Sequence, residues 1–445
     1  MTRYPAPGRV KTRLVPALGA DGAAELHSDL ARHCVRRMHA AAIGSGSRLE
    51  VHATGAPGRA VREWLGRRVP VRAQVAGSLG DRLSAAAARA LAAGAPAVVL
   101  VGSDAPDLGG DHVRAALGTL TQAHADAVLG PAVDGGYYLV ALTADAAGRA
   151  LPALFGTHVP WGTERVLDVT LGALGEAGLR VELLEPLADV DRPEDLPVWE
   201  RVLSEQQRVR LEPRLSVIIP ALNEQASIAE AVRSAREAGA DEVIVADGGS
   251  TDDTATLAEC AGARVLSVQR GRARQLNAGA ALATGDVLLF LHADTRLPAR
   301  AAVLVRDVLA DPDVAIGSFL FAAGSPSDRT DRLITAFGAW RHALFRLPYG
   351  DQAAFVRTRD FADIGGFPEL PTMEDYAFAQ RLARLGRIGV APAEARTSSR
   401  AWRDHGLVRT TLTNAAVIAG YRLGVAPERL AAVRARLASR QQLSR

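Results

Sequence analysis

Apolar and polar positions along the chain form two successive series of strand-sized and helix-sized segments. Short apolar runs are separated by longer Ala-rich stretches with helical spacing, and the same order begins again after a polar stretch near residue 204. Alternating strands and helices predict α/β units with mostly parallel sheets. The expected strands are 49–53, 97–101, 127–129, 215–219, 242–246, 264–268 and 287–291, and the expected helices include 20–42 and 59–66.

The apolar run 287–291 is unbroken, which is typical of a strand buried on both faces of a parallel sheet. It ends abruptly in His292, Ala293 and Asp294. Ligands of open α/β sheets bind beyond the carboxyl ends of the strands. A carboxylate there, with a second ligand two residues earlier, suits a divalent cation that also touches a diphosphate. The alternative is that Asp294 only caps the next helix.

The length of 445 residues exceeds what one ordinary core needs, so more than one domain is expected. We predict an N-terminal domain over residues 1–203, a polar linker over 204–213 and a C-terminal domain over 214–445. In the C-terminal domain the order β-α-β-α-β-α-β predicts a doubly wound nucleotide-binding half. No G-x-G-x-x-G follows its first strand, which disfavours a dinucleotide-dependent dehydrogenase.

Composition narrows the class of protein further. A hydrophobic content of 48% and a charged content of 23% are typical of a globular protein. The net charge of +3 and the aromatic content of 5% disfavour nucleic acid as a partner. No apolar run is long enough for a transmembrane segment and the start has no signal-peptide pattern, so we expect a cytoplasmic protein. The tail 427–440 fits either helix packing or peripheral contact with the membrane.

Only one of the 52 basic residues is a lysine, Lys11. It lies in a turn-rich loop, residues 5–14, together with Arg9 and Arg13. Glycine allows close approach of the backbone to a ligand, and three cations within five residues suit a phosphate chain. The alternative is an ordinary solvated basic loop.

Acidic residues follow several strands of the N-terminal half. Asp104 comes directly after the strand 97–101, and Asp134 lies in a Gly-Gly loop after the strand 127–129. Asp189 and Asp191 are one residue apart and share a side if the segment is extended. Helix caps alone are a poor explanation for so many acidic loops at strand ends.

These motifs of the N-terminal half carry a resemblance. P-x-P-G-R-V-K-T-R-L, G-S-D-A-P-D-L, G-P-A-V-D-G-G-Y-Y-L and D-V-D-R-P-E-D-L resemble radical-SAM/selenodomain-associated transferase 1, a family linked to arsenosugar biosynthesis. More distantly they resemble nucleotidyltransferases. The resemblance implies that Lys11 and Arg13 meet phosphates and that Asp104 and Asp191 hold a metal. The family has an apolar first strand where this chain has residues 1–3, so either the start lies upstream or the sheet lacks a central strand.

A second resemblance covers residues 214 to about 435. V-I-I-P-A-L-N-E, V-A-D-G-G-S-T-D-D-T, R-G-R-A-R-Q-L-N-A-G and F-L-H-A-D-T resemble family 2 glycosyltransferases of the GT-A fold. Y-G-D-Q-A-A-F-V-R, G-G-F-P-E-L-P-T-M-E-D-Y and S-S-R-A-W-R-D-H-G resemble one subgroup, radical-SAM/selenodomain-associated transferase 2. The chain therefore resembles a fusion of two GT-A-like (Rossmann-like) transferases.

The second resemblance implies roles for individual residues. It implies that Asp247 accepts hydrogen bonds from the base or ribose and that Asp294 binds the Mg²⁺ or Mn²⁺ that bridges the diphosphate. His292 stands where the usual D-x-D motif has its first Asp, and imidazole can also ligate Mn²⁺. The remaining expected donor-side residues are Pro220, Asn223, Glu224, Arg272, Arg274, Asn277, Arg400 and Arg403, with His405 as a further metal ligand.

The same resemblance implies that Asp375 is the general base for the acceptor hydroxyl, with Glu374 orienting it. From the residues alone, both could be first-turn charges of the helix 376–385, where the helix dipole favours them. Arg272 and Arg274 could likewise be a solvated helix face.

We therefore expect a metal-dependent, inverting glycosyltransferase that uses a nucleotide-sugar donor and a small-molecule or lipid acceptor. The cation offsets the charge of the departing diphosphate, and the carboxylate takes the acceptor proton. For the N-terminal domain two alternatives remain, a nucleotidyltransferase that makes the donor or a non-catalytic nucleotide-binding or scaffolding module.

Overall fold

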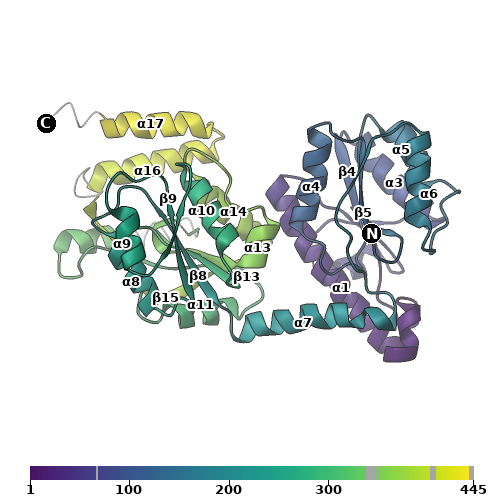
Figure 1. Ribbon diagram of the computed structural model, residues 1–445, viewed down its shortest axis with the longest axis horizontal. Coiled ribbons are helices and arrows are strands. Elements are labelled where there is room, and N and C mark those ends of the chain that lie inside the picture. The colour runs from purple at the N-terminus through teal and green to yellow at the C-terminus, as the bar shows by residue number, and fades with distance from the viewer. Residues whose placement is uncertain (67–68, 337–346, 349, 401–406, 440–445) are drawn as a thin grey trace. The chain divides into compact units, whose positions relative to one another are not determined.

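The computed structural model describes the chain except for residues 67–68, 337–346, 349, 401–406 and 440–445. It divides into two compact units, Met1–Gln206 and Gln207–Arg445, and in each unit helices pack on β-sheet (Figure 1). The division falls inside helix α7 (Leu196–Leu211). The segment 204–213 that we expected to be a linker is thus helical as far as Leu211, because its Glu, Gln and Arg residues are good helix formers.

The N-terminal unit contains two small sheets. The four-stranded sheet has the order β4-β6-β5-β7, in which β6 is antiparallel to both neighbours and β5 is parallel to β7. The three-stranded sheet β1-β2-β3 is parallel. The strands are β1 (Thr2–Arg3), β2 (Val51–Thr54), β3 (Val71–Ala73), β4 (Ala97–Val101), β5 (Ala127–Pro131), β6 (Tyr137–Thr143) and β7 (Val181–Leu183).

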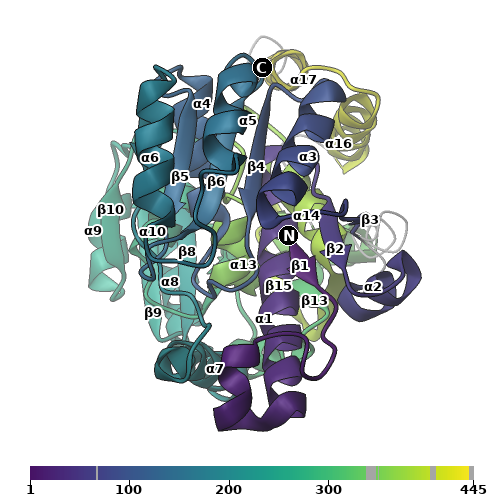
Figure 2. The same ribbon diagram turned by 90° about the vertical axis from the view of Figure 1, so that its right-hand side faces the viewer.

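Helices cover both faces of the four-stranded sheet, as Figure 2 shows for α3, α4, α5 and α6. Side chains such as Val128 and Ala141 pack against α1 and α4 on one face, whereas Leu129 and Val140 pack against α3, α5 and α6 on the other. Alternation along a strand explains the two sets. The helices are α1 (Val15–Ser45), α2 (Gly58–Leu65), α3 (Leu79–Ala92), α4 (Gly110–Thr121), α5 (Ala147–Phe155) and α6 (Val166–Glu176).

The place of the first strand, which we expected to be unfilled or taken by another segment, holds residues 1–3. Thr2 pairs with Ala53 of β2, and the amino group of Met1 donates a 2.9 Å hydrogen bond to the carbonyl oxygen of Val101 at the end of β4. Strand β1 is only two residues long and pairs with β2, and the two sheets of the unit remain separate.

The C-terminal unit is built on one eight-stranded sheet with the order β10-β9-β8-β11-β14-β13-β15-β12. The first four strands are mutually parallel, which confirms the predicted doubly wound half. Strands β12, β13, β14 and β15 were not predicted. The strands are β8 (Leu215–Ala221), β9 (Glu242–Asp247), β10 (Arg264–Ser267), β11 (Val287–Phe290), β12 (Thr295–Arg296), β13 (Val314–Ala323), β14 (Phe355–Arg357) and β15 (Arg387–Thr397).

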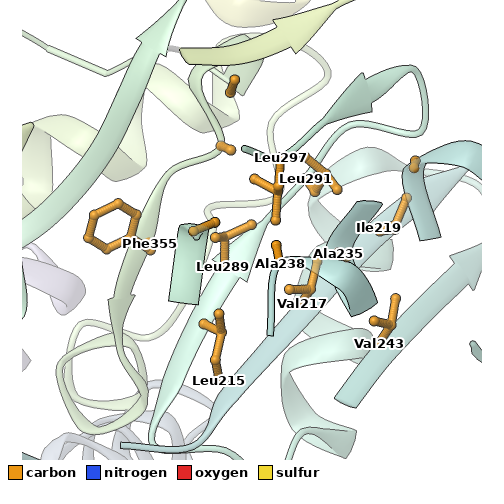
Figure 3. Close-up of a cluster of buried hydrophobic side chains, with 14 of the residues drawn as sticks. Leu215, Val217, Ile219, Ala235, Ala238, Val243, Leu289, Leu291, Leu297 and Phe355 are labelled. Carbon is orange, nitrogen blue, oxygen red and sulfur yellow. The ribbon is translucent and has the colours of Figure 1, made fainter. Parts of the chain in front are cut away.

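The core of this unit lies on both faces of β8 and β11. On one face Val217 of β8 and Leu289 of β11 pack against the helix α8 and its C-terminal end (Figure 3). On the other face Phe290 belongs to an aromatic cluster with Phe361, Phe367 and Phe378. Strand β11 is therefore buried on both faces, as predicted. The helices are α8 (Ile228–Glu237), α9 (Thr254–Cys260), α10 (Arg272–Leu282), α11 (Ala301–Leu309), α13 (Thr358–Asp363), α14 (Glu374–Leu385), α16 (Leu407–Arg422) and α17 (Pro427–Ser439).

Among the described residues, none of the helices combines the length and apolarity that crossing a membrane requires.

Candidate functional site

The candidate site lies at the carboxyl end of β11, where the chain turns sharply. The amide of Thr295 donates a 3.0 Å hydrogen bond to the carbonyl oxygen of His292, which closes a tight turn over residues 292–295. Both His292 and Asp294 are partly buried. Because the segment turns instead of continuing as a strand, the two side chains enter different surroundings.

His292 lies beside Arg272, Gly350 and Asp375. Nη2 of Arg272 contacts Nε2 of His292. A Cβ added to Gly350 would lie 2.7 Å from His292 Nε2 and 2.9 Å from Asp375 Oδ2, so any other residue here would make these side chains shift. Burial, and then the charge of Arg272, hold the pKa of His292 well below its usual value, so its imidazole is neutral near pH 7.

A pocket opens at this point, and its walls are largely apolar side chains from β8, β11, α10 and α14. The polar side chains among its lining residues are those of Arg272, His292 and Asp375. Such a mixture of apolar walls and a few convergent polar groups is typical of ligand sites. The other lining residues are Pro220, Leu276, Phe290, Leu291, Ile316, Pro348, Gly350, Ala354, Phe367, Phe378 and Ala379.

Asp375 and Glu374 begin helix α14, and both make contacts beyond that helix. Oδ2 of Asp375 accepts a 3.0 Å hydrogen bond from the amide of Gly350, and Oδ1 accepts one of 2.7 Å from the amide of Tyr376. Glu374 is buried, and its Oε1 lies 3.4 Å from Nε of Arg272. Both residues therefore contact other segments as well as their own helix, and the role of Asp375 as general base stays a prediction.

Asp294 has a different set of neighbours. Burial, and then the negative charge of Glu224, raise the pKa of Asp294, whereas Arg400 acts in the opposite direction. Nη2 of Arg400 donates a 2.8 Å hydrogen bond to Oε2 of Glu224. A partly buried carboxylate with a second carboxylate nearby suits a bound cation.

The described part of the chain holds no group of three His, Cys, Asp or Glu side chains that could bind a metal by itself. A cation at Asp294 would therefore need further ligands, which diphosphate oxygens can supply. Two predicted residues of this region, Arg403 and His405, lie outside the described residues.

The loops after β8 and β9 are joined by hydrogen bonds. Oδ1 of Asn223 accepts from the amide of Thr251 (2.9 Å), and the amide of Asn223 donates to Oγ of Ser250 (2.9 Å). Asp247 is buried, and it accepts from the amides of Gly249 and Ser250 at 3.1 and 3.0 Å. Asn223 and Asp247 thus hold the two loops in shape, and their contact with a nucleotide stays a prediction.

Helix α10 holds the glycine-rich loop near residue 366. Asn277 accepts from the amide of Phe367 and donates to its carbonyl oxygen, both at 2.9 Å. Arg274 pairs with Glu369 at 2.8 Å. Gln275, which the sequence analysis missed, donates to the carbonyl oxygens of Ala221 and Ala246 at 2.9 and 2.8 Å and so joins the ends of β8 and β9. Nothing in the sequence of helix α10 around Gln275 indicated this role.

The N-terminal unit brings several of its predicted residues together. Nζ of Lys11 lies 2.8 Å from Oδ1 of Asp104 and 3.7 Å from Oδ1 of Asp191, while Arg13 pairs with Asp191 at 2.6 Å. The Lys11 side chain is only 4% exposed. Although burial opposes ionisation of Asp104, the adjacent Lys11 lowers the pKa of that carboxyl group. Arg9 is exposed, outside the group that these contacts join.

Asp189 lies at the edge of this group. Burial, and then the negative charge of Asp134, raise the pKa of Asp189 to about 6. Asp134 is exposed, and its Oδ1 accepts a 2.9 Å hydrogen bond from the amide of Gly136 in the Gly-Gly loop. The structure thus gathers Lys11 and four carboxylates near the ends of β4 and β5.

Comparison with known families agrees with the two units. Residues 216–362 match Glycosyl transferase family 2, and residues 37–163 match the family described as "Uncharacterized protein conserved in bacteria (DUF2064)". The C-terminal unit therefore carries a family 2 glycosyltransferase domain. The chain joins it to a DUF2064 domain, which confirms the predicted fusion of two transferase-type units at the level of these families.

Individual relatives cover parts of the chain. A glucosyl-3-phosphoglycerate synthase from Mycolicibacterium paratuberculosis is 32% identical over 139 residues, which make up 28% of this chain and 42% of that protein. A PGL/p-HBAD biosynthesis glycosyltransferase from Mycobacterium bovis is 34% identical over 173 residues, 35% of this chain and 63% of that protein. The chain thus spans less than two thirds of either relative.

Two solved structures also match parts of the chain. A crystal structure of a putative nucleotide-diphospho-sugar transferase from Desulfovibrio desulfuricans is 34% identical, with a TM-score of 0.41, and the match covers 47% of this chain and 87% of that one. A glucosyl-3-phosphoglycerate synthase from Mycobacterium tuberculosis, solved with Mn²⁺, UDP and glucosyl-3-phosphoglycerate, is 23% identical with a TM-score of 0.32 over 44% of this chain and 74% of that one.

Proposed function

We propose that the protein is a divalent-metal-dependent, inverting glycosyltransferase that moves a sugar from a nucleotide-sugar donor to an acceptor hydroxyl. The observation that carries the proposal is that Asp375, His292 and Arg272 meet around Gly350 in a family 2 domain. Asp294 follows His292 by two residues. A carboxylate for the acceptor and a carboxylate for the donor thus lie at the end of one strand.

The donor half of the site is Asp294 with Glu224 and Arg400. The raised pKa of Asp294 supports a role in binding a cation, because an ion between the two carboxylates would remove their unfavourable interaction. When bound, Mg²⁺ or Mn²⁺ would neutralise charge on the departing nucleoside diphosphate. The Arg400 side chain is 51% exposed, and a guanidinium at this position suits a phosphate oxygen of the donor.

The acceptor half is Asp375. A sugar or alcohol hydroxyl is a poor nucleophile near neutral pH, and a positioned carboxylate increases its reactivity by taking the proton during attack. The amides of Gly350 and Tyr376 fix the Asp375 carboxylate, and each oxygen retains a lone pair for the incoming proton. With the base on the acceptor side and the leaving group on the opposite side of the anomeric carbon, one displacement inverts the configuration.

The test is a screen of nucleotide sugars against the full-length protein, with thermal stabilisation and donor hydrolysis as readouts. UDP-glucose with Mn²⁺ is the first probe, because glucosyl-3-phosphoglycerate synthases are among the relatives. Wild type should be stabilised by at least one donor only when metal is present, and Asp294→Asn should lose that response. If no nucleotide sugar stabilises or is hydrolysed by wild type with either metal, the proposal is wrong.

For the N-terminal unit we propose a nucleotidyltransferase activity that supplies the activated donor. The observation in its favour is the buried Lys11 between Asp104 and Asp191, since a lysine poised over carboxylates can meet the phosphates of a nucleotide. Pyrophosphate release from a nucleoside triphosphate and a sugar 1-phosphate should fall in Lys11→Met and persist in Asp375→Asn. No pyrophosphate release by wild type would instead favour a non-catalytic module, and equal release by wild type and Lys11→Met would rule out a role for Lys11.

A further inference from the structure

His292 and Asp294 have separate sets of interacting side chains, although they are only two residues apart. His292 contacts Arg272 and lies against Gly350, whereas Asp294 interacts with Glu224, Arg400 and Thr295. The turn closed by the amide of Thr295 separates them. A D-x-D-like pair that binds one ion needs both side chains on the same side, and this turn does not provide that arrangement.

Arg272 has partners on two sides. Its Nη2 meets Nε2 of His292, and its Nε lies 3.4 Å from Oε1 of the buried Glu374. A guanidinium group donates hydrogen bonds from several nitrogens in a fixed plane, so two partners at different edges define its orientation. An arginine has no lone pair to offer, so Nε2 of His292 must be the acceptor in this contact, and that lone pair is unavailable to a metal.

We infer that His292 is not a ligand of the divalent cation but a positioning residue, a hydrogen-bond acceptor that holds the Arg272 guanidinium beside Asp375. Arg272 is then the charged group that meets the donor's phosphates or the transferred sugar at the pocket mouth. The inference rests on the proposed function, and it means that Asp294 and its neighbours bind the cation without His292. It also explains why an imidazole can stand where D-x-D proteins have a carboxylate, because the position needs only an acceptor.

The first experiment measures metal binding directly. The signal of free Mn²⁺ in electron paramagnetic resonance, in the presence of UDP, gives the Mn²⁺ dissociation constant of full-length variants. His292→Leu should stay within about twofold of wild type, whereas Asp294→Asn should weaken binding by at least about tenfold, the lower end of what losing even an outer partner of a metal costs. Weakening by His292→Leu as large as that by Asp294→Asn would overturn the inference.

The second experiment tests whether His292 acts through Arg272. His292→Leu removes the acceptor, and Arg272→Lys keeps a positive charge near Glu374 but cannot reach both partners. Each change should lower kcat by a similar factor, and the double variant should be no worse than the more severe single variant. His292→Gln, which restores an acceptor oxygen, should recover part of the kcat lost in His292→Leu. If the loss of kcat in the double variant equalled the product of the losses in the two single variants, the inference would be overturned.

Wild type, His292→Leu, Arg272→Lys and the double variant also allow a test that needs no substrate. If His292 holds Arg272, the double variant should lose less thermal stability than the sum of the losses in His292→Leu and Arg272→Lys, because each single change already removes the same contact. Additive losses would contradict the contact itself. Failure of wild type to bind UDP with Mn²⁺ would count against the proposed function, while the stability cycle would still decide the role of His292.

Discussion

The amide of Gly350 donates a 3.0 Å hydrogen bond to Oδ2 of Asp375. This contact joins a short turn (Gly350–Gln352) before β14 to the first turn of α14, two segments separated by more than 20 residues. Because the turn also packs against His292 and Arg272, the proposed base and the end of β11 have fixed positions relative to each other.

Replacing Asp375 should abolish most transfer without affecting donor binding. Asp375→Asn keeps the size of the side chain and an acceptor for the Gly350 amide but cannot take a proton. We expect transfer to fall by about 10²–10⁴ while donor affinity stays within a few fold. Steady-state kinetics with the donor found in the screen give both values. Asp307→Asn, an exposed carboxylate on α11, is the control, and near-normal turnover of Asp375→Asn would refute the assignment.

Replacing Asp294 should remove the response to metal at little cost in stability. Because burial and Glu224 raise the pKa of Asp294, its ionised form is less favourable in the folded protein than in an unfolded chain. Asp294→Asn should therefore lose at most about 2 kcal/mol, the upper range for a lost helix cap. Melting curves with and without MnCl₂ and UDP measure both effects. Normal metal-dependent stabilisation of the variant would contradict the role of Asp294.

Asp189 should make the stability of the N-terminal unit depend on pH. Its pKa of about 6 in the folded protein exceeds the value of about 3.9 in an unfolded chain, so the folded state binds the proton more tightly. The stability that this proton provides is complete below about pH 4 and is lost as the pH rises through 6. Asp189→Asn should therefore match wild type at low pH and exceed it above pH 7, by at most about 3 kcal/mol.

Unfolding curves between pH 4 and pH 8 test this dependence. Asp145→Asn, an exposed carboxylate in the same unit, should give a difference from wild type that does not change with pH. A difference between Asp189→Asn and wild type that stayed constant across this range would show that Asp189 titrates normally.

Lys11 should contribute to stability as well as to any reaction of the N-terminal unit. Lys11→Met leaves Asp104 and Asp191 without their shared cation. We expect a loss of about 1–3 kcal/mol, less than the roughly 3–5 kcal/mol of a fully buried pair, because Asp104 is 44% exposed. Lys11→Met/Asp104→Asn should recover part of the loss in thermal melts, and Arg9→Met on the same loop should change little. If the double variant were no more stable than Lys11→Met, repulsion between carboxylates would not be the cause.

Gly350 should not tolerate a side chain. The added Cβ of Gly350→Ala would lie 2.7 Å from His292 Nε2 and 2.9 Å from Asp375 Oδ2, closer than real Cβ contacts. The turn or the Asp375 side chain must shift, so we expect lower kcat with donor affinity largely kept. Gly172→Ala, on a helix with open space around it, should instead stabilise by about 0.5–1 kcal/mol. Wild-type kcat in Gly350→Ala would show that the contact has no catalytic consequence.

The strands that the sequence predicted are those whose apolar runs identify them without reference to a partner. Strand β4 agrees to the residue, and β8, β9, β10 and β11 differ by one or two residues at their ends. Strand β13 has a long apolar run and was predictable from it. Strand β15 was missed because its sequence has no continuous apolar run, and its pairing with β13 joins residues about 70 apart with two register shifts. Such pairing depends on tertiary packing.

The candidate site was also predictable only in part. The positions of Asp294 and Asp375 follow from strand and helix ends together with the family resemblance, and the structure places both near the end of β11. The partners of His292 and Asp247 could not be predicted, because they depend on a turn at residues 292–295 and on a hydrogen-bonded loop. Side-chain partners that come from other segments leave no trace in local sequence.

The position of β14 between β11 and β13 has a consequence for the order in which the domain can form. β11 pairs with β8, which precedes it, and with β14, which follows it by more than 60 residues. During synthesis, β11 therefore keeps one unpaired, apolar edge until residue 357 has left the ribosome. An exposed apolar edge of this kind is a template for aggregation. A chain that ends between β11 and β14 should accumulate as inclusion bodies, whereas one that includes β14 has the means to close that edge.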